Sequence, residues 1–212
     1  MKRRLIRYLA LSGALVGCAP RLRPLGGVST PVALPDARLP AGAERIVFNW
    51  RLDDQQLAAR GEGVARVTAP DSARLDFFLA GGLGGGAAVL IGDSLTSPGP
   101  DFLRRLVPPP PLMWGALGRL AVPALADTVM RVAGDTVRAD IGKPVRWRAS
   151  FMQGALRRLE RVDGGRVQEW VERSDSTHVH YRNESGRRSL DIVITRSESV
   201  AGFDSTIWRI PQ

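Results

Sequence analysis

Hydrophobic and polar residues alternate along most of the chain after residue 44. The clearest run places Ile46, Phe48, Trp50 and Leu52 at every second position, with mostly polar residues between them. A period of two puts these apolar side chains on one face of a β-strand. Together with the turn signals between apolar runs, the pattern predicts about ten or eleven short strands. They span residues 46–52, 61–68, 87–91, 128–132, 136–141, 145–151, 156–162, 167–173, 177–181, 189–195 and 205–210.

The pattern changes between residues 98 and 123, where a helical period replaces the alternation. Residues 101–106 predict a short helix, the four prolines 108–111 end it, and residues 112–120 predict a second one. On the second helix Met113, Leu117 and Leu120 share one side, with Trp114 beside them. Strands on both sides of a helical insert predict an α+β fold. We expect a curved antiparallel half-barrel of about ten or eleven strands, with short helices covering its concave apolar face.

The N-terminal segment has the pattern of a bacterial export signal. Four basic residues, Lys2, Arg3, Arg4 and Arg7, precede a short apolar run over residues 8–16, and Cys18 follows. The stretch Leu-Val-Gly-Cys at residues 15–18 resembles the lipobox of bacterial lipoproteins. That resemblance implies cleavage before Cys18 and acylation of its thiol, and two or three acyl chains anchor a protein stably to a membrane.

These features divide the chain into three parts. Residues 1–17 are the expected signal peptide, residues 18–43 a lipidated cysteine followed by a Pro/Gly/Ala-rich tether, and residues 44–212 a single domain with its helical insert at about residues 100–121. The prolines of the tether exclude a helix or a central strand there. A tether of this composition reaches about 30 to 70 Å.

The charge of the chain points to a membrane surface. The whole sequence carries 30 Lys and Arg against 21 Asp and Glu, and removal of the four basic signal residues leaves 26 against 21, or +5. An exported, anchored protein meets anionic lipid head groups, so we expect no nucleic-acid partner. Arginines dominate the basic residues, and a compositional bias without a specific partner explains them equally well.

The sequence contains no set of residues that specifies an enzyme. Motifs for a serine nucleophile, a phosphate loop and a zinc protease are all missing. The two histidines, His178 and His180, share one face of a predicted strand and could hold a metal with Glu184 or Asp175. Solvent-facing histidines are the simpler interpretation. We therefore expect no catalytic residues, no metal and no cofactor.

Several short motifs together resemble the LolA/LolB superfamily of bacterial lipoprotein carriers and outer-membrane lipoprotein receptors. They are the lipobox, the strand with Trp50 followed by Arg60 and Gly61, residues 70–77, Leu83 in its glycine loop, residues 92–95, and residues 111–123. The resemblance implies a half-open barrel with helices at its mouth and an apolar cavity for acyl chains. It also implies that Leu83 contacts the membrane, although its neighbours are nearly all glycine. The expected cavity residues are Trp50, Leu75, Phe77, Val89, Ile91, Met113, Trp114, Leu117, Trp147 and Phe151.

Two functions follow as hypotheses. The first is a monomeric, non-enzymatic lipoprotein that binds acyl chains of lipoproteins or other amphiphiles and delivers them to the outer membrane, with a periplasmic carrier protein as a possible donor. Residue 19 is Ala and not Asp, which favours the periplasmic face of the outer membrane as its location. The alternative is a structural or assembly lipoprotein of the envelope, with a filled core and a protein partner.

Overall fold

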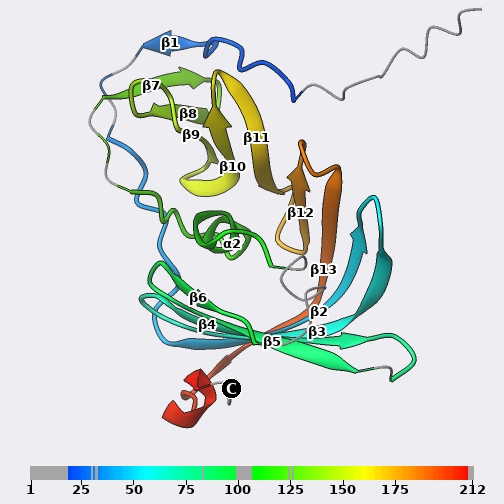
Figure 1. Cartoon of the computed structure of the whole chain (residues 1–212). Coiled ribbons are helices and arrows are strands. Elements are labelled where there is room, and N and C mark those ends of the chain that lie inside the picture. Colours follow the sequence, from blue (N-terminus) through cyan, green and yellow to red (C-terminus); the bar gives the residue numbers. More distant parts are fainter. Residues whose placement is uncertain are drawn as a thin grey trace, which may run out of the picture.

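A single antiparallel sheet organises the protein (Figure 1). The computed structural model describes residues 19–29, 31, 33–82, 84–98, 107–123, 125 and 127–209. Over these residues the sheet has 13 strands in the order β1-β7-β8-β9-β10-β11-β12-β13-β2-β3-β4-β5-β6, and β1 and β6 are its two open edges.

The strands have the following bounds: β1 Val28–Ser29, β2 Ala43–Asp53, β3 Ala58–Thr68, β4 Ser72–Leu79, β5 Gly85–Ile91, β6 Ser94–Thr96, β7 Thr128–Ala133, β8 Thr136–Ile141, β9 Trp147–Met152, β10 Ala155–Asp163, β11 Arg166–Arg173, β12 His178–Asn183 and β13 Arg188–Val200.

The predicted alternation determines which face of each strand is buried. On β2 the side chains of Phe48, Trp50 and Leu52 are buried, and the residues between them are exposed or half-buried. The sheet curves strongly, so its two halves face each other across the concave side (Figure 1). Buried apolar side chains from both halves form one hydrophobic core.

One α-helix, α2 (Pro110–Ala116), lies on the concave side between the two halves of the sheet (Figure 1). Its first residue is a proline, which fits a helix start because the missing N–H has no partner there. It ends earlier than the predicted residue 120, since Gly118 adopts a positive φ of 88° that an α-helix excludes. The helix contacts β10, β11 and β12.

The structure corrects the sequence prediction at two places. The described residues form 13 strands and not ten or eleven: β1, β4 and β6 are not among the predicted ranges, and β1 and β6 are too short to show an alternation. Residues 205–210 were predicted as a strand, yet Ser205–Trp208 form a 3-10 helix, η1, whose start is capped by the Asp204 side chain. The helix predicted at residues 101–106 lies outside the described residues.

The N-terminal segment runs along the sheet. The Leu22 amide donates to the Gly165 carbonyl at 2.9 Å, and the Val167 amide donates to the Pro20 carbonyl at 3.0 Å. Further on, β1 pairs with β7. The prolines do exclude a helix and a central strand, but these contacts place residues 19–29 against the domain and not in a freely extended tether.

No helix in the described part of the chain has the length and apolar character needed to cross a bilayer.

Candidate functional site: an apolar cavity with a charged rim

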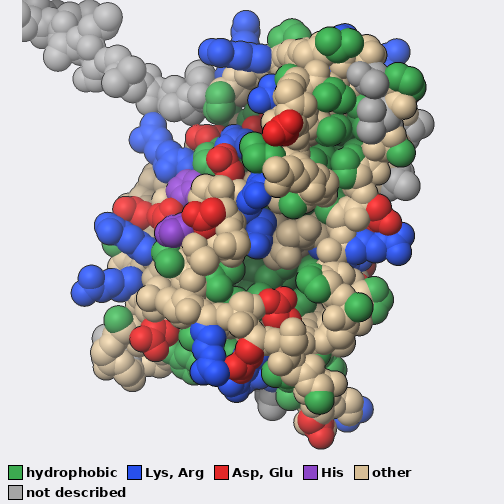
Figure 2. Space-filling model, turned by 180° about the vertical axis from the view of Figure 1, so that it is seen from behind, with side chains coloured by type: hydrophobic (Ala, Val, Ile, Leu, Met, Phe, Trp, Pro, Cys, Tyr) green, Lys and Arg blue, Asp and Glu red, His purple; other side chains and the backbone are tan. Residues whose placement is uncertain are grey.

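A cavity of about 320 Å³ lies between α2 and the strands around β2. This volume is at the lower end of the range of ligand pockets in proteins, roughly 300 to 1,000 Å³. Figure 2 shows a hollow on one face of the molecule with hydrophobic side chains inside it and charged side chains around it. The cavity is lined by Pro40, Glu44, Ile46, Phe48, Ala65, Leu75, Met113, Ala116, Leu117, Arg173, Ser176, Val179, Ile192, Ile194 and Ser197.

The strand register explains why these residues meet. Directly opposed residues of an antiparallel pair point to the same face. Ile194 opposes Phe48, and Ile192 on the same strand opposes Val179. On the other side of β2, Ile46 opposes Ala65, which in turn opposes Leu75. Five neighbouring strands thus present small or aliphatic side chains to one concave surface, and α2 lies over it.

The rim of the cavity is polar. Glu44 accepts a hydrogen bond from the Ser197 hydroxyl, and Arg173 donates to the Ala116 carbonyl at the end of α2. Burial lowers the pKa of the Arg173 guanidinium, and repulsion from Arg157 lowers it further. The cavity therefore combines an apolar interior with a partly desolvated cation at its edge.

Three of the predicted cavity residues line this cavity: Leu75, Met113 and Leu117. Trp50 and Phe77 are on the same concave face, but they pack with Phe48 into an aromatic cluster beside it. The Phe77 ring centre is 5.8 Å from that of Phe48 and 6.0 Å from that of Trp50, both edge to face. Trp114 is fully buried in the core, where its indole N–H donates to the Gly92 carbonyl at 2.6 Å.

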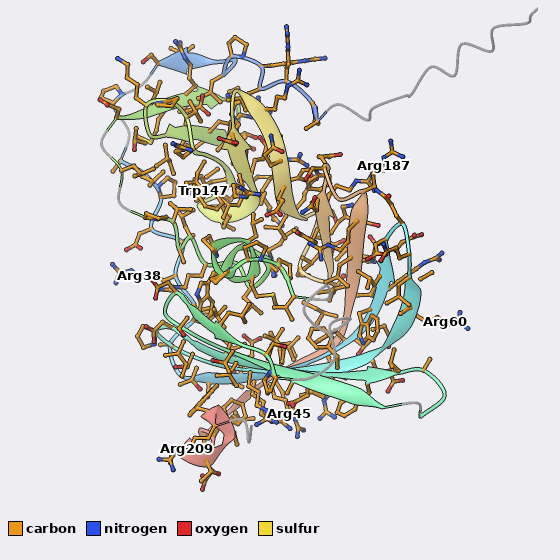
Figure 3. All side chains as sticks on the ribbon, viewed as in Figure 1. Arg38, Arg45, Arg60, Trp147, Arg187 and Arg209 are labelled. Atoms are coloured by element: carbon orange, nitrogen blue, oxygen red, sulfur yellow. The ribbon has the colours of Figure 1, made fainter. Side chains whose placement is uncertain are left out.

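Other predicted cavity residues lie elsewhere. Leu75 opposes Ala88 on β5, so Val89 and Ile91 point to the opposite, convex face, and Ile91 is 45% exposed. Trp147 and Phe151 are buried in β9, and Figure 3 places Trp147 across α2 from β2–β6. None of these four lines the cavity. Cys18 and Leu83 lie outside the described residues.

The prediction missed most of the cavity wall, above all Phe48, Ile192 and Ile194. A usable signal was present in the glycines of β3. Gly61 opposes Trp50 and Gly63 opposes Phe48, and a Cβ atom at Gly63 would lie 2.3 Å from the Phe48 ring. Glycines opposite aromatic residues make room for the rings to lie flat on the sheet.

A second hollow lies at the edge of β2, β3 and β13, and it is larger and more open. Its volume is about 600 Å³. Its wall carries five polar or charged residues, Asn49, Arg51, Arg60, Glu62 and Asp191, beside apolar ones such as Trp50 and Val193. This hollow is open to solvent, so the smaller and more enclosed cavity is the better candidate site for an apolar ligand.

The two histidines point to the convex face and pair with separate carboxylates. The His178 ring contacts Asp175 at 2.9 Å, and the His180 ring contacts Asp191 at 2.5 Å. The Glu184 carboxylate accepts from the Trp170 indole at 2.8 Å. Among the described residues no group of three or more His, Cys, Asp or Glu side chains could hold a metal ion.

Replacing both His178 and His180 with alanine is therefore expected to leave metal content unchanged, because a metal site needs a third ligand that this face does not supply. Elemental analysis of the purified wild type and double variant, both exposed to equimolar zinc, tests this. Stoichiometric zinc in the wild type that the double variant loses would contradict it.

Comparisons with known proteins identify the fold. A LolA superfamily protein from Nitrosomonas europaea superposes with a TM-score of 0.53 at 12% sequence identity, over 83% of this chain and 94% of that one. A DUF1329 family protein from Desulfovibrio piger gives a TM-score of 0.48 at 9% identity, over 80% and 90% of the two chains. An outer membrane lipoprotein-sorting protein domain from Vibrio parahaemolyticus gives 0.37 at 8% identity, over 79% and 89%. No family model matches the sequence, and no curated protein sequence is similar to it.

The first of these superpositions shows that the chain has the LolA fold. The fold that the sequence motifs led us to expect is thus confirmed.

Proposed function

Given a LolA-like fold with an apolar cavity on its concave face, we propose that this protein is a non-enzymatic lipoprotein that binds acyl chains of lipoproteins or other amphiphiles and delivers them to the outer membrane. The observation that carries this proposal is the cavity beneath α2, whose interior is lined by aliphatic and aromatic side chains. Transfer of a bound chain needs no covalent step. Burial of apolar surface supplies the driving force, about 25 cal/mol per Å².

The position of the N-terminal segment supports a membrane anchor at Cys18. Ala19 accepts a hydrogen bond from the Arg166 side chain at 3.0 Å, and Pro20 pairs with Val167, so the chain directly after Cys18 lies at the β10–β11 turn. A lipid on Cys18 would hold the domain at the periplasmic face of the outer membrane.

The first experiment asks whether the cavity binds an apolar ligand. Every strand pair and core side chain described above lies after residue 18, so a chain that begins at Ala19 keeps all of these contacts. We expect this chain to copurify with lipid in native mass spectrometry, or to bind the apolar fluorophore N-phenyl-1-naphthylamine saturably. A folded protein with neither copurified lipid nor saturable binding would refute the carrier function.

We further propose that Leu83, between β4 and β5, contacts the membrane during delivery. Phe78 on β4 is 51% exposed and adds a second apolar side chain near this connection. Inserting a Leu side chain into lipid contributes about 1.5 to 3 kcal/mol. Leu83→Glu is therefore expected to slow release of bound lipid into vesicles by roughly tenfold or more, with unchanged thermal unfolding.

The matched control for this experiment is Leu79→Glu, at a half-buried position that packs against the core. It is expected to lower thermal stability instead. Release from Leu83→Glu at the wild-type rate would remove Leu83 from the delivery step.

The structural or assembly alternative has one observation in its favour. The half of the core formed by β7–β11 is filled by large side chains such as Trp147, Phe151 and Leu159. Several arginines on the outer face are already paired, as Arg148 is with Asp140 at 2.6 and 2.8 Å. Paired arginines are less available to a protein partner, which is why we favour the carrier function.

A further inference from the structure

The arginine at the cavity mouth forms no ion pair with another described residue. Arg173 lies on the concave face, since it opposes the cavity residue Val179. One of its five N–H donors goes to the Ala116 carbonyl. Within the described residues, no carboxylate forms an ion pair with Arg173.

A second arginine lies close to the first. Arg157 sits where the β10 register shifts against β9, between Leu156 and Arg158. Its charge lowers the pKa of Arg173, as burial also does. The Arg157 Nε is buried and has no hydrogen-bond partner in the part of the chain that the structure describes. Arg173 is thus the arginine that lines the cavity, and Arg157 adds a second positive charge near it without lining the cavity itself.

Nearby carboxylates are held by other groups. Glu44 accepts from Ser197, and Asp175 accepts from the Thr177 amide at 2.6 Å and the His178 amide at 2.8 Å. Both raise the pKa of Arg173 through space, although less than burial and Arg157 lower it. A largely buried cation without an ion-pair partner is unfavourable, so an anion supplied by the ligand would stabilise this arrangement.

We propose that the cavity takes an amphiphile with an oxyanion head group, such as a phosphate monoester, which Arg173 binds at the mouth, in the positive field that Arg157 adds, while the acyl chain occupies the interior. This inference rests on the proposed function and narrows its ligand class. Guanidinium groups match the geometry of phosphate oxygens, and the apolar wall of Ile46, Ile192 and Ile194 continues directly from the rim.

The test compares head groups on one chain length. Dodecyl phosphate, dodecylphosphocholine and inorganic phosphate are each used to displace N-phenyl-1-naphthylamine from the chain that begins at Ala19. We expect dodecyl phosphate to bind about tenfold or more tightly than dodecylphosphocholine, and inorganic phosphate to displace nothing, since a charge-assisted contact adds to chain burial and does not replace it.

Two variants identify the arginines. Arg173→Gln keeps a donor for the Ala116 carbonyl but removes the charge, and the affinity ratio of the two amphiphiles is expected to fall close to one. Arg157→Gln is expected to lower the same ratio, and it leaves the contact with Ala116 in place should Arg173→Gln fail to fold. Arg60→Gln removes an equal charge from an exposed side chain that points away from the interior (Figure 3) and is expected to keep the wild-type ratio.

The outcomes separate the two proposals. Saturable probe binding with equal affinities for both amphiphiles would overturn the head-group inference and leave the carrier function standing. An affinity ratio that Arg173→Gln and Arg157→Gln do not change would overturn the assignment of these arginines. Absence of any saturable binding would refute the proposed function itself, and the head-group inference with it.

Discussion

Replacing Trp114 with alanine is expected to lower the free energy of unfolding by about 3 to 5 kcal/mol, the range for a large aromatic residue removed from a packed core. The Trp114 side chain is completely buried, and its indole N–H donates to the Gly92 carbonyl. Removing the indole would leave that carbonyl without this donor. The Arg119 guanidinium also lies over the ring, 4.7 Å from its centre. Chemical denaturation of the chain that begins at Ala19 measures the effect.

The control for this prediction is Trp170→Ala. Trp170 lies on the convex face, half-buried between Arg158, 3.9 Å from the ring centre, and His180. Its removal deletes contacts that are partly exposed to solvent and leaves no internal cavity. We therefore expect the free energy of unfolding to fall by less than half as much as in Trp114→Ala. Equal losses in the two variants would mean that α2 does not form part of the core.

The position of Trp114 shows where sequence reasoning reached its limit. Helical spacing correctly placed a helix around Met113 and Trp114 and indicated that it would be buried. It could not distinguish a side chain that faces a cavity from one that fills the core, because both are apolar positions of the same helix. In the structure Met113 and Leu117 line the cavity, whereas Trp114 contacts Gly92 across the core.

The strands show a similar division between what could and could not be predicted. The alternation over residues 46–52 gave the buried face of β2 correctly, and the strands predicted at 156–162 and 167–173 are the neighbouring strands β10 and β11. The phase of β5 was not predictable, since residues 87–91 are all apolar. Only its register with β4 shows that Ala88 and Leu90 face the core, which is why Val89 and Ile91 were assigned to the wrong face.

The order of the strands in the sheet could not be predicted from the sequence either. The two cavity isoleucines of β13 lie about 140 residues from β2 in the chain, yet β13 pairs with β2 along its whole length. Local periodicity carries no information on which distant strands pair. Arg173 was missed for the same reason. It opposes Val179 on β12 and donates to the Ala116 carbonyl, and no local sequence pattern links it to either residue.

The structure also shows how a filled core and an apolar cavity can coexist in one sheet. Under β7–β11 the concave face is filled by Trp147, Phe151 and Leu159. Under β2–β4 the Trp50 and Phe48 rings cover Gly61 and Gly63, and the small side chain of Ala65 lines the cavity. The cavity therefore lies at this end of the fold, and its wall residues are the ones to alter.

The second large effect is expected from a substitution in the cavity wall that fills the cavity. Ile194→Trp places a larger side chain at a half-buried position on the concave face, opposite Phe48. We expect affinity for N-phenyl-1-naphthylamine to fall by roughly tenfold or more, corresponding to at least about 1.4 kcal/mol of binding free energy. Val193→Trp is the matched control, since the neighbouring side chain points to the convex face and is 39% exposed. Its affinity is expected to equal that of the wild type.

Stability measured on the same two variants separates a cavity from a filled interior. If the space between Ile194 and α2 is empty, the tryptophan occupies it and the free energy of unfolding changes by less than about 1 kcal/mol. If side chains already fill that space, overpacking by Ile194→Trp would destabilise the protein by about 1 to 3 kcal/mol. Loss of probe binding together with retained stability supports a ligand cavity at this position. Retained binding would exclude the wall of β13 from the binding site, because the substituted ring would then have to lie outside the ligand's space.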